Sequence, residues 1–286
     1  MQTETLTRDI ARHSGATHAL QAMRAIVWRE LAKFSRQYGR LISALVRPLL
    51  WLAVFAAGFR NVFGVAIVEP YDTYIPYDVY IAPGLVGMVL LFNGMQSSLA
   101  MVYDREMGLM RLLLTAPLPR AWILLSKLTA TAVLSLAQAA AFVIVAALLG
   151  TALPVFGPQT PMVLLSAVCA ALMLGALGLL LSVHIKQLEN FAGTMNFVIF
   201  PMYFLSTALY PLWKLEESGA DWVYRIAQVN PFTHAVEWLR FALYGKDAGI
   251  SPYIVVGTLV VCFVLASWGY DPQRGFGALT KRGGPP

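Results

Sequence analysis

The sequence predicts an all-α polytopic membrane protein with six transmembrane helices. Charged residues make up only 13% of its 286 residues and apolar residues 58%, which is less charge than the surface of a soluble domain needs. The apolar residues gather in blocks of about 20, the length of helix that crosses a bilayer. Basic residues cluster at the ends of these blocks, so the net charge of +6 indicates contact with a membrane surface rather than with nucleic acid.

Residues 1–40 are predicted to form a cytoplasmic N-terminal segment that contains an amphipathic interfacial helix over residues 20–40. Apolar residues at spacings of three and four form one narrow stripe: Leu20, Met23, Val27, Leu31, Phe34 and Tyr38. The opposite side is basic and carries Arg29, Lys33, Arg36 and Arg40. A helix of this kind lies along a membrane with its cations near anionic headgroups, which makes membrane lipids expected partners. Packing on a soluble partner is the alternative.

The six spans fall within residues 41–270, and residues 271–286 are left as a cytoplasmic tail. The predicted spans cover residues 41–63, 79–103, two stretches within 128–185, 191–212 and 251–270. Residues 128–185 contain no Asp, Glu, Lys or Arg, but Gly and Pro break the middle of this block at 150–161. The first span is the least regular, because Arg47 and Arg60 interrupt it.

The distribution of Lys and Arg predicts the orientation. The N-terminal segment and the loop between the second and third spans are rich in arginine, whereas residues 64–78 and 150–161 contain no basic residue. The positive-inside rule therefore places both termini in the cytoplasm, with the chain in the cytoplasmic (inner) membrane. Four tyrosines then fall at the outer boundary, where we expect them to anchor in the headgroup layer: Tyr71, Tyr74, Tyr77 and Tyr80.

Residues 104–120, DREMGLMRLLLTAPLPR, concentrate charge between two apolar blocks. They can form a short helix with Asp104 and Glu106 near its N-terminus, where the helix dipole favours anions, and with Pro117 at its end. The leucines give this helix an apolar side. The residues alone are compatible both with a juxtamembrane helix that fixes topology and with a docking element for a separate cytoplasmic protein.

Three stretches resemble type-2 ABC exporter permeases. The pattern E-x-G-x-x-x-x-L-x-x-x-P, here Glu106, Gly108, Leu113 and Pro117, resembles their first cytoplasmic loop. Residues 203–215, YFLSTALYPLWKL, are similar to the end of their fifth span, and residues 230–240, NPFTHAVEWLR, to the motif before their last span. The resemblance covers nearly the whole chain in order and is strongest to nodulation-factor and drug-export permeases.

This resemblance implies that residues 104–119 form a coupling helix in a groove of a cytoplasmic ABC ATP-binding subunit. The implied coupling residues are Asp104, Glu106, Gly108, Arg111, Leu113, Leu114 and Pro117. It also implies a homodimer with two ATP-binding subunits, and short re-entrant helices at the outer leaflet before the last span. The sequence contains no G-x-x-x-x-G-K-[ST] motif. We therefore expect ATP and Mg to be bound by the partner subunit, with no cofactor or metal bound by this chain and no catalytic residues in it.

Polar residues before and within the spans supply further candidate sites. In the outer region, Asn230 can cap a helix begun by Pro231, and Glu237 can pair with Arg240 one turn away; a structural role is the simpler interpretation of that pair. Polar residues inside predicted spans are costly unless they are paired or hydrated. They either line a transport pathway or bond neighbouring helices: Asn93, Gln96, Gln138 and Asn196.

The leading hypothesis is the permease subunit of an ATP-driven exporter that moves an amphipathic or lipid-like substrate outward. An ion-coupled secondary transporter is one alternative, but it normally needs an acidic residue in the core of a span, and the predicted span cores have none. An intramembrane lipid-modifying enzyme is another. The sequence offers it neither an H-E-x-x-H motif nor clustered acids, and His184 and His234 are predicted on opposite sides of the membrane.

Overall fold

The computed structural model describes residues 2–36, 38–59, 64–65, 70–71, 75–107, 119–151, 153–185, 187–217 and 219–269. Its regular structure is α-helical apart from one short antiparallel pair, β1 (Gly64–Val65) with β2 (Ile75–Pro76). The longer helices are α1 (Gln2–Ser35), α2 (Tyr38–Phe59), α3 (Tyr77–Glu106), α5 (Arg120–Leu148), α6 (Thr160–His184), α7 (Leu188–Phe204) and α11 (Ser251–Gly269). Three shorter helices lie between α7 and α11: α8 (Leu212–Glu217), α9 (Asp221–Val229) and α10 (Pro231–Leu243). The predicted all-α class is confirmed.

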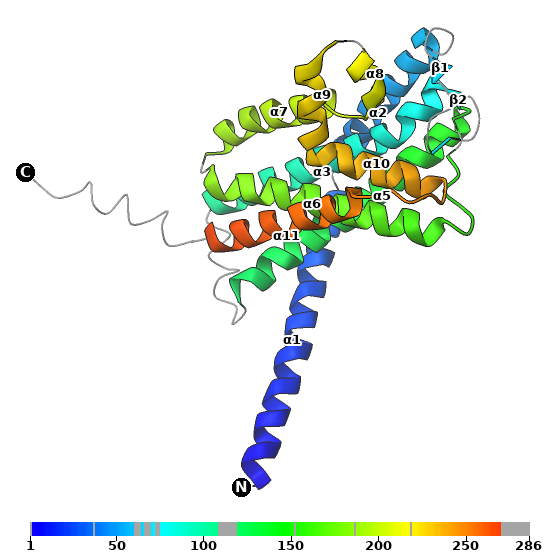
Figure 1. The fold of residues 1–286 in the computed structure, drawn as a ribbon. Helices are drawn as coiled ribbons and strands as arrows, with labels where there is room; N and C mark the ends of the chain where they lie inside the picture. Colours follow the sequence, from blue (N-terminus) through cyan, green and yellow to red (C-terminus); the bar gives the residue numbers. More distant parts are fainter. Residues whose placement is uncertain are drawn as a thin grey trace, which may run out of the picture.

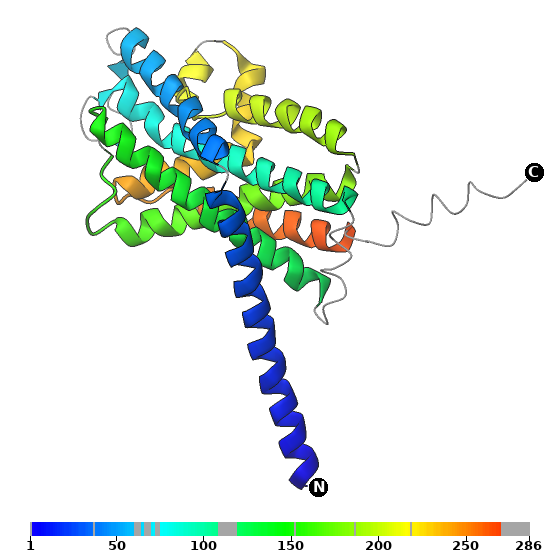
Figure 2. The ribbon, with the colours of Figure 1, turned by 180° about the vertical axis from the view of Figure 1, so that it is seen from behind.

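Four of the predicted spans correspond to long apolar helices. In the described part of the chain, α3, α5, α6 and α11 are long and apolar enough to cross a membrane. They pack side by side, with α6 in contact with the other three (Figures 1 and 2). They correspond to the predicted second, third, fourth and sixth spans, which supports a multi-pass membrane protein.

The predicted first and fifth spans are not confirmed as crossing helices. In the described part of α2 the apolar stretch is Leu45–Val54, and it contains Arg47 and Pro48. The helix α7 has 17 residues and contains Pro201. It ends at Phe204 rather than near residue 212, and the chain continues without helical structure until α8 begins.

The helix α1 does not have the bounds predicted for the interfacial helix, which were residues 20–40. The helix α1 starts at Gln2 and ends at Ser35, whose hydroxyl donates a hydrogen bond to the carbonyl of Ala32 at 3.0 Å. Such local side-chain bonding competes with helix continuation, and α2 begins separately at Tyr38. The packed face also differs from the prediction, since Leu20 is exposed and Ile26 is buried. The ribbon views show α1 crossing the long helices and extending away from them (Figures 1 and 2).

The helices α3 and α6 approach closely at two glycines. A Cβ atom on Gly178 would lie 2.8 Å from the backbone oxygen of Gly94, and one on Gly94 would lie 2.9 Å from the backbone of Leu174. Small residues at helix contacts allow membrane helices to pack backbone against backbone. This contact fixes α3 in the centre of the bundle, where most of its residues from Tyr77 to Met95 are buried.

We predict that Gly178→Val destabilises the protein, by about 1–3 kcal/mol, because the added side chain must push α3 and α6 apart. The matched control is Gly257→Val on α11, where an added Cβ would meet nothing within 4 Å. Steric-trap unfolding in bicelles measures both variants. Equal stability of the two variants would contradict the close contact.

Candidate coupling junction and polar interior

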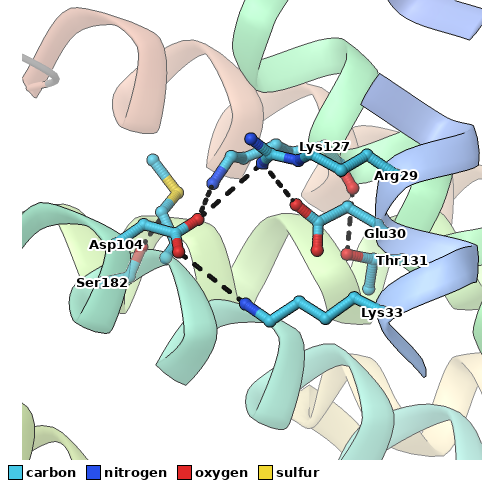
Figure 3. Close-up of polar contacts among 8 residues, drawn as sticks. Arg29, Glu30, Lys33, Asp104, Lys127, Thr131 and Ser182 are labelled. Carbon is cyan, nitrogen blue, oxygen red and sulfur yellow. Dashed lines mark hydrogen bonds and ion pairs between the residues drawn. The ribbon is translucent and has the colours of Figure 1, made fainter. Parts of the chain in front are cut away.

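A buried carboxylate joins three helices at the end of α3. The Asp104 side chain is 6% exposed and its Oδ2 accepts a hydrogen bond from the Lys127 ammonium at 2.9 Å. Two cations of α1 approach the same carboxylate, Lys33 at 3.8 Å and Arg29 at 4.0 Å. Figure 3 shows these side chains converging on Asp104 from α1 and α5. Asp104 therefore connects α3 to both helices.

The surrounding cations make this burial possible. An ionised carboxylate loses its hydration on burial and needs hydrogen bonds and opposite charge in return. Lys127 supplies the direct bond, whereas Arg29 also donates to Glu30 at 2.7 Å. Arg29 and Lys33 were predicted to face lipid headgroups. In the structure their partly exposed side chains approach Asp104, and their contact with headgroups stays a prediction.

The last turn of α3 also contacts the connection between α6 and α7. The guanidinium of Arg105 donates to the carbonyl of Ile185, and Glu106 Oε1 accepts from the backbone N–H of Leu188 at 2.9 Å. Three successive residues of α3 thus contact α1, α5 and the start of α7.

The sequence suggested that Asp104 and Glu106 begin a new helix, and the structure contradicts this. They lie in the last turn of α3, which ends at Glu106. Acidic residues at a helix C-terminus are unfavourable with respect to the helix dipole, and here Lys127 and the α1 cations offset that cost for Asp104. The other predicted coupling residues lie outside the described residues, and their role stays a prediction: Gly108, Arg111, Leu113, Leu114 and Pro117.

A second contact between α3 and α5 is formed by neutral side chains. The amide of Asn93 donates to Oε1 of Gln138, and both residues are buried. Asn93 lies eleven residues before Asp104, and Gln138 lies eleven residues after Lys127. The two contacts therefore mark the ends of one antiparallel seam, roughly 16 Å long at 1.5 Å per residue.

A pocket opens along this seam between α1, α3 and α5. Its volume is about 570 Å³, counting space open to solvent, and its lining includes Asn93 and Asp104 of α3 with Lys127 and Thr131 of α5. A smaller pocket of about 260 Å³ shares Asn93 and reaches Gln96 and Arg47. The Arg47 guanidinium lies 3.9 Å from the ring centre of Phe92, within cation–π range.

The predicted polar span residues thus separate into two groups. Asn93, Gln96 and Gln138 come together at or beside these pockets, whereas Asn196 is exposed on α7 and lines neither of them. Sequence reasoning missed Lys127, because a charged residue was taken as the boundary of the third span. The sequence signal that could have identified Lys127 is the opposite charge of Asp104 at the end of the preceding apolar block.

The predicted cap and ion pair within residues 230–240 are both present in the structure. The helix α10 begins at Pro231, and the Asn230 side chain caps it by accepting from the N–H of Phe232 at 3.0 Å. The amide of Asn230 also donates to the carbonyls of Met202 and Leu205, each at 2.8 Å. This cap therefore joins the start of α10 to the end of α7.

The predicted pair of Glu237 with Arg240 also forms, around a deeply buried guanidinium. Arg240 is 2% exposed; it donates to Glu237 and to the carbonyl of Thr207, the latter at 2.9 Å. Its guanidinium carbon lies 4.1 Å from the ring centre of Tyr80. Arg240 thus holds α10 against α3 and against the non-helical residues after α7.

The tyrosines near this pair are not lipid anchors. Tyr71, Tyr77 and Tyr80 are at most 6% exposed, and Tyr74 lies outside the described residues. The Tyr77 hydroxyl donates to the carbonyl of Leu209 at 2.7 Å, and that of Tyr80 to the carbonyl of Thr207 at 3.1 Å. Burial raises the pKa of Tyr71. The anchoring prediction is wrong for these three, because all three rings are buried inside the protein.

Comparison with known proteins agrees with these features. A sequence profile of the ABC-2 type transporter family matches residues 21–244. Three similar proteins are each named "Putative transport permease ycf38". The Pyropia yezoensis protein is 30% identical over 259 residues, which cover 88% of this chain and 81% of that one. The Porphyra purpurea protein is 30% identical over 241 residues, covering 82% and 78%, and the Cyanophora paradoxa protein is 31% identical over 238 residues, covering 80% and 76%. The chain belongs to the ABC-2 type transporter family.

Proposed function

We propose that this chain is the permease subunit of an ATP-driven exporter that moves an amphipathic or lipid-like substrate outward. The observation that carries the proposal is the family match, which extends over residues 21–244, from within α1 to the end of α10. Permeases of this family normally pair with an ATP-binding subunit. A separate subunit would bind and hydrolyse ATP with Mg, because this sequence has no phosphate-binding loop motif of its own.

The proposed assembly contains two copies of this chain and two ATP-binding subunits. In it α2 and α7 complete six spans, both termini are cytoplasmic, α1 lies along the inner membrane surface, and α8 to α10 lie at the outer leaflet. The exposed apolar side chains of α2 and α7 support a further contact with lipid or with a second copy, among them Leu50, Val54, Phe197 and Phe200.

In this assembly the junction at the end of α3 would receive the movement of the ATP-binding subunits. Residues 108–118 follow directly after it, and Arg105 and Glu106 contact the connection between α6 and α7. Packed elements with fixed contacts move as rigid bodies. A displacement of residues 108–118 would therefore reach α1 through Asp104 and α7 through Glu106.

We predict that Glu106→Ala reduces substrate transport at least tenfold while the partner subunit retains ATPase activity. The substitution removes the acceptor for the Leu188 N–H, whereas Glu106→Gln keeps an acceptor oxygen and should retain transport. Gly108→Pro is expected to uncouple in the same way. The assay uses proteoliposomes containing the chain with its ATP-binding subunit, and records transport and ATP hydrolysis together. Wild-type transport in Glu106→Ala and Gly108→Pro would overturn the coupling role.

The same preparation distinguishes this function from the alternatives. An ATP-driven permease shows ATPase activity only when the partner subunit is present. An ion-coupled transporter would move substrate under an ion gradient without ATP, and a lipid-modifying enzyme would yield a changed lipid. Either outcome would replace the proposed function.

A further inference from the structure

Arg47 of α2 lies against the middle of a long apolar helix. Its guanidinium carbon is 3.9 Å from the ring centre of Phe92. Residues 77–91 of α3 precede Phe92 and residues 93–106 follow it, so Phe92 is at the midpoint of this helix. At a rise of 1.5 Å per residue, each end of α3 is roughly 20 Å away. Since α3 is long and apolar enough to cross a membrane, Arg47 lies near its mid-depth.

The positive charge of Arg47 has no acidic partner among the residues that the structure describes. Its contact with Phe92 is a cation–π interaction, which returns less free energy than a guanidinium loses in the hydrocarbon of a bilayer. The next residue, Pro48, has no backbone N–H and cannot bond the carbonyl four residues earlier. Both features favour water over hydrocarbon at this point of α2.

Two pockets provide a route by which water can reach Arg47. The smaller pocket, about 260 Å³ including space open to solvent, lies between α2 and α3 and is lined by Arg47, Asn93 and Gln96 among others. The larger pocket shares Asn93 with it and continues past Ser97 to Asp104. These α3 residues recur at spacings of three and four, so they form one face of the helix. That face carries polar side chains from Arg47 to the end of α3.

The charges along this face are predominantly positive. Five ionic side chains meet at the Asp104 end, and they leave one net positive charge. They are the cations Arg29, Lys33 and Lys127 and the acids Glu30 and Asp104. Arg47 adds a second positive charge further along the route. Charges in the low-dielectric wall of a narrow cavity act more strongly than in open water, so the route attracts small anions and repels small cations.

We propose that the pocket between α2 and α3 is filled with water and that Arg47 acts there as an electrostatic barrier to small cations. A permease that opens a hydrated path for a large substrate must still prevent protons and metal cations from leaking through it. A guanidinium suits this role because it keeps its positive charge, and arginines exclude cations in this way in other membrane pores. The proposal rests on the proposed function only in placing this water in the transport pathway.

Cysteine chemistry at Gln96, which lines the same pocket as Arg47, tests the proposal. The full-length chain carries Cys169→Ala and Cys262→Ala, so that Gln96→Cys introduces its single thiol. In nanodiscs this thiol reacts separately with a sulfonate and a trimethylammonium methanethiosulfonate of similar size, and each rate is divided by the rate with free mercaptoethanol. We expect the anionic reagent to be favoured about tenfold, because a nearby unit charge attracts one reagent and repels the other.

Variants of Arg47 show whether this residue causes the preference. Arg47→Gln should lower the anion-to-cation rate ratio about fivefold or more, whereas Arg47→Lys keeps the charge and should keep the ratio. The matched control is Arg225→Gln on the exposed surface of α9, which should leave the ratio unchanged. Both reagents attack the same thiolate, so the ratio is independent of how Arg47 affects the ionisation of the thiol. A ratio unchanged by Arg47→Gln would overturn the barrier role.

Two further positions establish whether the pocket holds water. Ser97→Cys, in the adjoining pocket, repeats the measurement with a smaller change of side chain, should Gln96→Cys fail to fold. Val261→Cys on the apolar helix α11 is 57% exposed at the parent residue, and we expect it to face lipid and to react with neither reagent. Absence of reaction at both Gln96→Cys and Ser97→Cys would mean that lipid or a second copy fills the space, and would overturn the proposal.

The labelling assay contains neither ATP nor the ATP-binding subunit. Failure of charge-selective labelling therefore removes the barrier and leaves the ATP-driven permease function standing. Absence of partner-dependent ATPase activity together with charge-selective labelling would remove the permease function and leave the hydrated, positively charged pocket.

Discussion

Lys127→Met is expected to lower the free energy of unfolding by about 3–5 kcal/mol, because it leaves the buried Asp104 carboxylate without its hydrogen-bonded partner. The two side chains are only 8% and 6% exposed, so little water reaches the carboxylate to replace the lost bond. The cations of α1 stand at 3.8 and 4.0 Å, too far for direct hydrogen bonds. Steric-trap unfolding in bicelles gives the free energy.

A double variant separates the missing partner from the loss of the lysine itself. Asp104→Leu combined with Lys127→Met removes both charges, and an apolar pair of similar volume in place of a buried ion pair is often neutral or stabilising. We therefore expect the double variant to be more stable than Lys127→Met alone. Lys214→Met is the surface control: Lys214 is 57% exposed and 3.6 Å from Glu217, and its loss should cost less than about 1 kcal/mol. A double variant no more stable than the single one would contradict the pairing.

The same pair illustrates what sequence reasoning could not reach. Hydropathy located the four long helices because a run of apolar residues is a local signal. It began the third span only at residue 128, after Lys127, since a lysine is costly in a membrane unless something pairs with it. The partner, Asp104, lies 23 residues earlier on another helix, and only the packing of α3 against α5 brings the two together.

Among the candidate sites, too, contacts between neighbouring residues were predictable from the sequence and contacts between distant residues were not. The cap by Asn230 and the pair of Glu237 with Arg240 span two and three residues, so helix geometry alone predicts them. The contacts of Tyr80 and Arg240 with the Thr207 carbonyl join residues 127 and 33 positions apart. The spacing of residues in the sequence does not predict such long-range contacts. The tyrosines were therefore assigned to the lipid interface, where aromatic rings are common.

The second large expected loss of unfolding free energy comes from substituting Arg240. Arg240→Met removes a fully buried guanidinium, the partner of Glu237 and a donor to the Thr207 carbonyl. We expect a loss of about 3 kcal/mol, the lower end for breaking a buried ion pair, because Glu237 is 21% exposed and regains some hydration. The same unfolding measurement applies, with the exposed Arg225→Met on α9 as control, expected within about 0.5 kcal/mol of the parent.

Arg240→Lys tests whether the shape of the guanidinium matters as well as its charge. A lysine keeps the positive charge near Glu237 but lacks the planar fork that reaches two acceptors at once and stacks on Tyr80. We therefore expect Arg240→Lys to recover only part of the lost stability. Amide exchange of residues 205–210 should then be faster than in the parent, since Arg240 and the tyrosines hold the carbonyls of Thr207 and Leu209. Parent-like exchange in both Arg240 variants would mean that Tyr77 and Tyr80 alone fix this segment.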